Sequence, residues 1–332
     1  MRAAACCEMN CGMGTSRQRK KRQTYRYPKA RRPIWWRRPP ARDSDLEPIN
    51  LDRGGDVDGR AELSRFYRRA RKVLRHIFRV ARAKDHVQFA FALSPESRGM
   101  RDTGWNTAAE ASVARKQLTD LVSAIPTRSP VRVRVGLSLY AHMAEVAGYY
   151  ELPKNMLNIA GGEFWNMYPF HELVASHKVT GEQIAPNASR VLKDLIGHAS
   201  DIGFPELGQV ITEAFDFDLR NGYAHADYIV WSDGIRLPRR NGGRSKTVPY
   251  ERFGLLLNKA LAFFSALQEV QEECLRRYWP PLLVRGRMNA YQAEEYAILT
   301  WNPTEGWFQI KMYGGVGPDH PVLRRGLNDD DL

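Results

Sequence analysis

The sequence predicts a mainly α-helical bundle with small β-hairpin additions, and three stretches carry this prediction. Residues 60–83 repeat apolar side chains every three or four positions, which is the period of an amphipathic helix. A second stripe of this kind runs from Pro249 to about Tyr278. From Pro280 onward the helical pattern stops, and EYAILTW, NPTEG and WFQIKMY follow the pattern of two strands joined by a turn.

The first helix, at residues 60–83, has an apolar stripe on one face and many arginines on the other. Asp58 is suited to cap it, because an acidic residue is favourable at the start of a helix. Two interpretations of the basic face stay open. Such a face usually belongs to a helix packed on a core and is simply solvated; the alternative is a surface that contacts nucleic acid.

Capping residues and prolines predict where several further helices begin and end. Thr107 and Glu110 have the spacing of a capping box and Pro126 follows, so we expect a helix at residues 107–125. Residues 131–152 open with the alternation VRVRV but then become apolar nearly all round, which favours one buried helix up to Pro153. Shorter helices are expected at residues 154–160, 187–200 and 205–215.

In two segments between these helices, the sequence pattern identifies the secondary structure of one but not of the other. YIVW and IRL flank Ser232-Asp233-Gly234, which predicts a β-hairpin just after the stretch FDFDLRNGYAHADY. VQFAFALS, between the first two helices, is apolar and short, so its pattern fits a strand or a helix equally well.

Changes of pattern divide the chain of 332 residues into four parts. We expect a disordered tail at residues 1–59, an N-terminal helical region at 60–129, a helical domain at 130–280 and a C-terminal β-hairpin extension at 281–332.

No internal repeat and no glycine-rich phosphate-binding loop is present in the sequence. No cofactor is therefore expected.

The predicted tail lacks hydrophobic periodicity and is rich in arginine, proline and glycine. One interpretation is an electrostatic arm that contacts nucleic acid through Trp35, Trp36, Arg37 and Arg38, with the indoles stacking on bases. The others are a solvated tail, or a start codon assigned too far upstream. The three cysteines near residues 6–11 have no histidine nearby and lack zinc-type spacing, so no metal site is expected there.

The net charge of +13 is concentrated near the N-terminus. Residues 1–42 carry 13 Lys or Arg and one acidic residue, and residues 60–84 carry ten and one. Residues 85–332 carry 26 basic and 29 acidic residues, which leaves this larger part at −3. An argument for nucleic-acid binding from charge therefore concerns residues 1–84 only.

Composition also indicates the cellular setting. No apolar run approaches the ~20 residues of a membrane span, and the basic N-terminus lacks the continuous apolar segment of a secretion signal. The four cysteines do not form the pattern of a disulfide framework. These features predict a cytoplasmic protein without membrane partners.

The best candidate site is the stretch FDFDLRNGYAHADYIVW at residues 215–231. It places Arg220 five residues before His225, but about one such pair is expected by chance in this composition. The sequence holds a second pair, Arg71 and His76, inside the first basic helix, and we interpret that one as coincidence.

The residues around Arg220 and His225 distinguish the first pair from the second. Asn221 and Gly222 follow the arginine, and alanines flank the histidine, so a substrate would have room to approach. In a helix, Asn221 and His225 would share a face, and the long side chain of Arg220 could reach beside it. Arginine suits phosphate oxygens, and histidine suits proton transfer near neutral pH.

His142 and Glu145 lie three residues apart in an otherwise apolar segment. The simpler interpretation is that the two side chains satisfy each other, since buried polar groups need partners. The alternative is that they line the active cleft. A metal site would need a third ligand, which this spacing does not supply.

LRNGYAHADY, with the preceding LYAHMAEVAGYY and the long apolar helix that follows, resembles the HEPN superfamily of helical domains. That family carries an R-x4-6-H motif, typically with a polar residue after the arginine, and Asn221 fills that position. The resemblance covers roughly residues 130–280, and it implies a HEPN-like helical bundle in that part of the chain.

The resemblance implies a metal-independent endoribonuclease, of a kind that often serves as a toxin or defence effector. His225 would then be the general acid or base, Arg220 would hold the scissile phosphate, and Asn221 would orient the histidine or contact phosphate. RNA, a second copy of the chain and a neutralising protein are the partners implied. The alternative is a non-catalytic module that binds RNA, a nucleotide or a protein.

Overall fold

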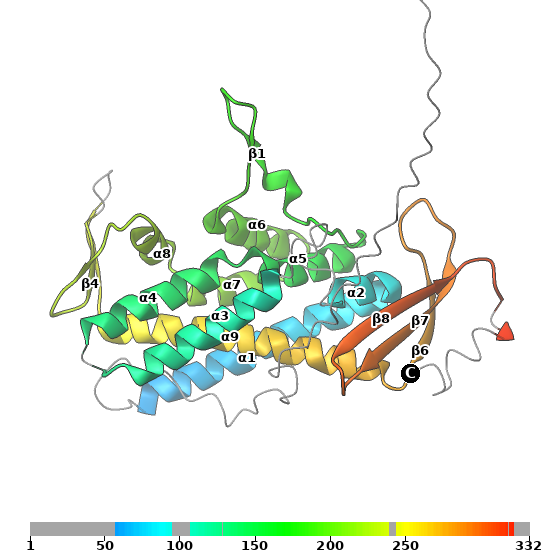
Figure 1. Ribbon diagram of the computed structural model, residues 1–332, viewed down its shortest axis with the longest axis horizontal. Helices are drawn as coiled ribbons and strands as arrows, with labels where there is room; N and C mark the ends of the chain where they lie inside the picture. The colour runs from blue at the N-terminus through cyan, green and yellow to red at the C-terminus, as the bar shows by residue number, and fades with distance from the viewer. Residues whose placement is uncertain (1–56, 95–106, 128, 239–243, 318, 322–332) are drawn as a thin grey trace, which may run out of the picture. The chain divides into compact units, whose positions relative to one another are not determined.

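The computed structural model describes residues 57–94, 107–127, 129–238, 244–317 and 319–321, all within one compact unit of the chain (Figure 1). The predicted tail up to residue 56, with its contact residues Trp35, Trp36, Arg37 and Arg38, lies outside these residues. The predicted boundary at residue 59 is wrong, because residues 57–59 belong to the first helix. The described part is mainly helical, which confirms the coarse fold prediction.

Long helices alternate with short strands along the chain. The helices are α1 (Val57–Lys84), α2 (His86–Leu93), α3 (Thr107–Ala124), α4 (Pro130–Glu145), α5 (Ala147–Gly161), α6 (Ala188–Asp201), α7 (Pro205–Ala214), α8 (Phe217–Ala224) and α9 (Tyr250–Leu275). The strands are β1 (Ala175–Ser176), β2 (Gln183–Ile184), β3 (Ile229–Val230), β4 (Ile235–Leu237), β5 (Lys246–Val248), β6 (Leu282–Gly286), β7 (Glu295–Asn302) and β8 (Trp307–Tyr313).

The two helices with the clearest stripes, α1 and α9, pack along one another, and their apolar faces contribute to the same core (Figure 1). α1 also packs against α5 and α7. Each of these helices contributes buried side chains to one continuous cluster, among them Leu74 of α1, Met156 of α5, Leu207 of α7 and Phe263 of α9. The predicted N-terminal helical region thus shares its core with helices from residues 130–280.

The prediction of one helix from 131 to 152 is wrong. The helix breaks at Val146, which separates α4 from α5, and α5 continues through Pro153 to the left-handed Gly162. An interior proline costs about 3 kcal/mol because it removes a hydrogen bond and crowds the preceding turn. Burial of Leu152 and Met156 beside it offsets that cost.

The ambiguous segment VQFAFALS forms α2. Asp85 caps this helix by accepting a hydrogen bond from the backbone N–H of Gln88 at 2.9 Å. α2 lies close to β6, and a Cβ on Gly286 would stand only 2.5 Å from Cγ2 of Val87. Glycine is therefore required at residue 286 for this contact between helix and strand.

Both predicted hairpins are confirmed, and each belongs to a three-stranded antiparallel sheet. β3 and β4 pair through Ile229 and Arg236, with β5 added on the far side of β4. β7 and β8 pair through Leu299 and Ile310, with β6 added on the far side of β7. β1 and β2 form a further short pair that the sequence pattern did not indicate.

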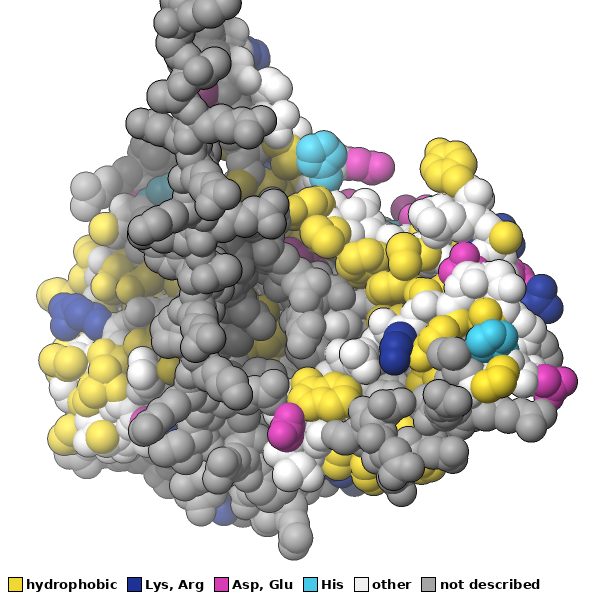
Figure 2. Space-filling model, turned by 45° about the vertical axis from the view of Figure 1, so that its right-hand side comes forward, with side chains coloured by type: hydrophobic (Ala, Val, Ile, Leu, Met, Phe, Trp, Pro, Cys, Tyr) yellow, Lys and Arg dark blue, Asp and Glu magenta, His cyan; other side chains and the backbone are white. Residues whose placement is uncertain are grey.

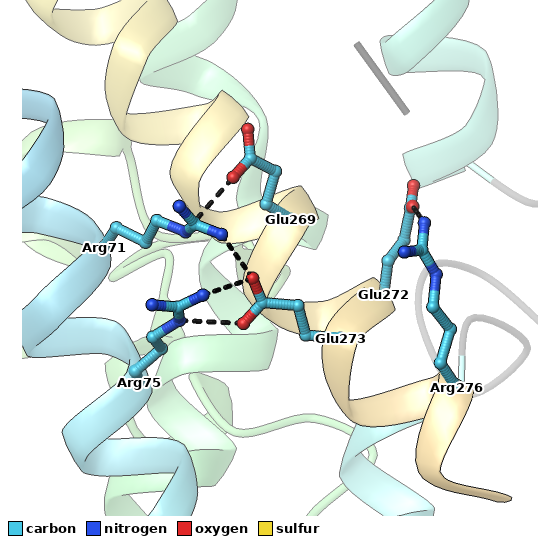
Figure 3. Close-up of polar contacts among 6 residues, drawn as sticks. All are labelled: Arg71, Arg75, Glu269, Glu272, Glu273 and Arg276. Carbon is cyan, nitrogen blue, oxygen red and sulfur yellow. Dashed lines mark hydrogen bonds and ion pairs between the residues drawn. The ribbon is translucent and has the colours of Figure 1, made fainter. Parts of the chain in front are cut away.

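Ion pairs link the basic helix α1 to the acidic end of α9, as Figure 3 shows. Arg71 reaches Glu269 at 3.2 Å and also binds Glu273, while Nε of Arg75 donates to Glu273 at 2.8 Å. The hydrogen bond from Arg75 is the largest influence on Glu273 and holds the pKa of that carboxyl below its ordinary value of 4.5.

We expect a Glu273→Gln variant to lose less stability than the parent chain as the solution becomes acidic. Because the pKa of Glu273 is lower in the folded state, its contribution is fully present above the unfolded value of 4.5 and is lost as pH falls through the folded value. Urea unfolding at neutral pH and below pH 4.5 measures how far the free energy of unfolding falls with pH in each variant. The exposed Glu172 provides the control. If Glu172→Gln flattens the pH dependence as much, the ion-pair explanation fails.

Among the described residues, no helix is both long and apolar enough to cross a membrane.

Candidate functional site

The candidate site is built on α8, and the start of this helix is fixed by a cap. Oδ1 of Asp216 accepts hydrogen bonds from the backbone N–H groups of Asp218 at 3.0 Å and Leu219 at 3.1 Å. Its other oxygen, Oδ2, lies 2.6 Å from Nζ of Lys246 on β5. One side chain thus joins the first turn of α8 to the small sheet beside it.

A buried tyrosine ties the same region to α4. The hydroxyl of Tyr140 donates to the carbonyl of Ala214 at 3.0 Å and accepts from the backbone N–H of Asp216 at 2.6 Å. Burial raises the pKa of Tyr140 far above its ordinary value, so the hydroxyl keeps its proton. The connection between α7 and α8 is therefore held from the core side.

The end of α8 is fixed by close packing against the β3–β4 hairpin. A Cβ on Gly222 would lie 2.5 Å from Cδ2 of Leu237 on β4 and 3.2 Å from the carbonyl oxygen of Asp227. A larger residue at 222 would push this buried leucine away. Gly222 therefore allows α8 to pack closely against Leu237 of β4, and this role does not depend on any catalytic function of the site.

Arg220 points inward from α8 toward the end of α4. Its side chain is 11% exposed, forms an ion pair with Glu145, and donates from Nη1 to Oδ1 of Asn221 at 2.7 Å. Nε of Arg220 is buried without a hydrogen-bond partner. Burial lowers the pKa of Arg220 from its ordinary value, yet a guanidinium stays charged in proteins at neutral pH.

His225 lies just beyond the last residue of α8, and it is exposed. Its backbone N–H donates to the carbonyl of Asn221 at 3.0 Å. Within the described part of the chain, no hydrogen bond or ion pair joins its ring to Arg220 or Glu145. The structure thus brings Arg220, Asn221 and Glu145 into direct contact and leaves His225 free at the same end of the helix.

The idea that His142 and Glu145 satisfy each other is wrong. The ring of His142 donates from Nε2 to the carbonyl of Ala111 on α3 at 3.0 Å, whereas Glu145 binds Arg220. Glu145 is therefore part of the candidate site, and His142 helps to attach α3 to α4. The role of either residue in an active cleft stays a prediction.

The second pair with the same spacing has a different environment. Arg71 binds two carboxylates of α9, and the ring of His76 lies 5.5 Å from the ring of Phe204. Arg79 approaches Nδ1 of His76 at 2.9 Å. The contacts of Arg71 with α9 and of His76 with Phe204 attach α1 to its neighbours, in keeping with the interpretation of this spacing as coincidence.

Sequence reasoning missed the groups that support the site from outside the motif. Tyr140 lies in an apolar helix, where nothing in the pattern marks its hydroxyl as the link to α8. Lys246 follows a Gly/Arg-rich loop, and its partner Asp216 is 30 residues away. Asp216 itself could have been found, because Asp before a short helical segment is a common cap.

The face drawn in Figure 2 shows mostly hydrophobic side chains among its described residues, with Lys and Arg side chains few and separated. Among all described residues, no group of three or more His, Cys, Asp or Glu side chains is arranged to hold a metal ion.

No family model, curated protein or solved structure matches the chain.

Proposed function

We propose that the chain is a HEPN-like, metal-independent endoribonuclease whose site is formed by Arg220, Asn221 and His225. The observation that supports this most is the cluster on α8: a charged arginine held by Asn221 and Glu145, with an exposed histidine at the end of the same helix. Such groups suit metal-independent cleavage of a phosphodiester, because the histidine can move a proton and the arginine can stabilise the charge that develops on the phosphate.

In the proposed reaction, His225 takes the proton from an RNA 2′-hydroxyl, and the oxygen attacks the adjacent phosphorus. The bond from phosphorus to the 5′-oxygen breaks, that oxygen takes a proton from a water molecule, and His225 returns its proton to the hydroxide that remains. The products are a 2′,3′-cyclic phosphate and a 5′-hydroxyl. Arg220 balances the charge that develops on the phosphate oxygens, and Asn221 fixes the guanidinium through the bond from Nη1.

The exposed position of His225 fits a site that a second copy of the chain completes. Arg220 and His225 of one chain do not contact each other through their side chains, so the arginine of one copy and the histidine of another could act on one phosphate. Ile229 and Trp231, both exposed just after His225, offer apolar surface for such a homodimer.

The test is cleavage of a labelled RNA in the presence of EDTA by the purified full chain. We expect His225→Ala and Arg220→Ala each to lower the rate on the order of 100-fold or more, because each removes a group that acts in the transition state. His171→Ala, which changes an exposed histidine of another segment, should cleave like the parent. A parent chain that leaves RNA intact, or full activity in His225→Ala, would exclude the proposal.

The second candidate is a non-catalytic module that binds RNA, a nucleotide or a protein. The ion pair between Arg220 and Glu145 favours it, because a buried guanidinium with a carboxylate partner is already neutralised. Under this candidate the parent chain would bind a partner without cleaving RNA, and replacing Arg220 would chiefly reduce stability.

A further inference from the structure

The side chains of α1 fall into three zones around the helix. Successive residues are about 100° apart, and the buried residues, such as Phe66, Ala70, Leu74 and Ala81, all lie on the side that faces the core. Between residues 63 and 84 the helix has no acidic residue. The remaining surface therefore carries nine Lys or Arg side chains without an opposite charge on the helix itself.

Three of these cations are neutralised by neighbouring helices. Arg69 forms an ion pair with Glu213 of α7, while Arg71 and Arg75 bind the carboxylates of α9 drawn in Figure 3. Arg69 lies on one flank of the outer face, and the other two lie on the opposite flank. These pairs attach α1 to the bundle from both sides.

The zone between the two flanks keeps its charge. Arg65, Arg68, Lys72 and Arg79 are exposed, and no ion pair joins any of them to another described residue. They lie within about 60° of one another and span about 21 Å along the helix. We call these four residues the α1 stripe. It points away from the core, opposite the buried residues.

We infer that the α1 stripe binds the phosphate backbone of RNA. The inference deepens the proposed function, on which it rests for the choice of RNA as the polyanion. A linear row of unpaired cations suits a chain of regularly spaced phosphates, and arginine in particular matches their oxygens. The stripe thus supplies the charge that residues 85–332, with a net charge of −3, lack.

Other anionic partners fit the α1 stripe less well. An amphipathic helix at a lipid surface inserts apolar side chains, but those of α1 are buried in the core. An interface with a protein has an apolar centre, and the stripe has none. Phosphate contacts without base contacts give affinity without sequence preference, so the stripe would hold RNA rather than select it.

The test measures binding of a fluorescent single-stranded RNA of mixed sequence to the full chain over a range of salt concentrations. His225→Ala serves as the parent so that the RNA stays intact. Replacing Arg65, Arg68 and Lys72 with glutamine removes three phosphate contacts. We expect the slope of log affinity against log salt to fall by about 2, and affinity near 0.1 M salt to fall on the order of 100-fold.

A triple variant of Lys178, Arg190 and Arg287 to glutamine is the matched control, since it removes the same charge from exposed positions that no ion pair joins to another described residue. Equal losses in the two triple variants, or no loss in the α1 variant, would overturn the inference, as would a parent that does not bind RNA. Single-stranded DNA should show the same dependence on the stripe. Equally stripe-dependent binding to phosphatidylserine vesicles would count against RNA as the occupant.

This binding experiment and the cleavage assay together separate this inference from the proposed function. If the α1 stripe binds RNA but the chain is not a nuclease, RNA affinity falls in the triple variant while the unmodified chain never cleaves RNA. If the chain is a nuclease but the α1 stripe does not bind RNA, His225→Ala abolishes cleavage and the triple variant binds RNA like its parent.

Discussion

Replacing Phe215 with alanine is expected to lower the free energy of unfolding by about 3–5 kcal/mol. Phe215 is 3% exposed, and its ring lies 6.0 to 6.4 Å from the rings of Tyr140, Tyr150, Phe263 and Phe264. Removing the ring leaves a cavity among four aromatic side chains that are themselves fixed by the core. Neighbours of this kind cannot move in to fill the space, so the upper part of the range applies.

Phe217, two residues later, is the matched control. It is only partly buried, and Nζ of Lys193 lies 5.8 Å above its ring. We expect Phe217→Ala to cost about 1–2 kcal/mol, since less apolar surface returns to water. Urea denaturation followed by circular dichroism gives both values. Equal losses in the two variants would show that Phe215 is not the anchor of the connection that leads into α8.

α1 and α9 could be predicted from their hydrophobic period, and α6 and α7 from capping residues and prolines. All four helices lie within a few residues of their predicted ranges. α4 and α5 are buried nearly all round, so no period marks where one ends and the other begins. The break at Val146 depends on contacts such as the hydrogen bond from Tyr150 to the carbonyl of Met143.

The candidate site could be predicted in its residues but not in its contacts. The motif named Arg220 and Asn221, which do contact each other, yet the ion pair joins Arg220 to a residue 75 positions earlier. Glu145 was singled out, but with His142 as its expected partner. A charged side chain in an apolar segment predicts that a partner exists, and only the fold decides which one.

The short strands were the hardest elements to predict. β1, β2 and β5 have two or three residues each, too few to show an alternating pattern. β5 nevertheless carries Lys246, which binds the cap of α8. β1 pairs with β2, and β5 pairs with β4. Which strand a segment of this size pairs with is decided by the fold, and its own residues do not contain that information.

Changing Glu145 to alanine is expected to destabilise the chain by about 2–3 kcal/mol, because it leaves the largely buried guanidinium of Arg220 without its carboxylate. The charge left unpaired by Arg220→Ala should cost less stability than the one left by Glu145→Ala, since Glu145 is 41% exposed and can be hydrated. The double variant should lose less than the sum of the two, with a coupling energy of about 1–3 kcal/mol in urea denaturation. Additive losses would mean that the ion pair contributes nothing to stability.

Glu145→Gln then distinguishes an arginine that binds phosphate from one that only supports the fold. Glutamine keeps the shape and an acceptor oxygen but removes the competing negative charge, so a phosphate should bind Arg220 more easily. In the His225→Ala background we expect RNA affinity to rise by roughly 10-fold, equivalent to about 1.4 kcal/mol. The gain should disappear when Arg220→Ala is added. If Glu145→Gln lowers stability and leaves RNA affinity unchanged, Arg220 is a structural residue and the non-catalytic candidate is the better one.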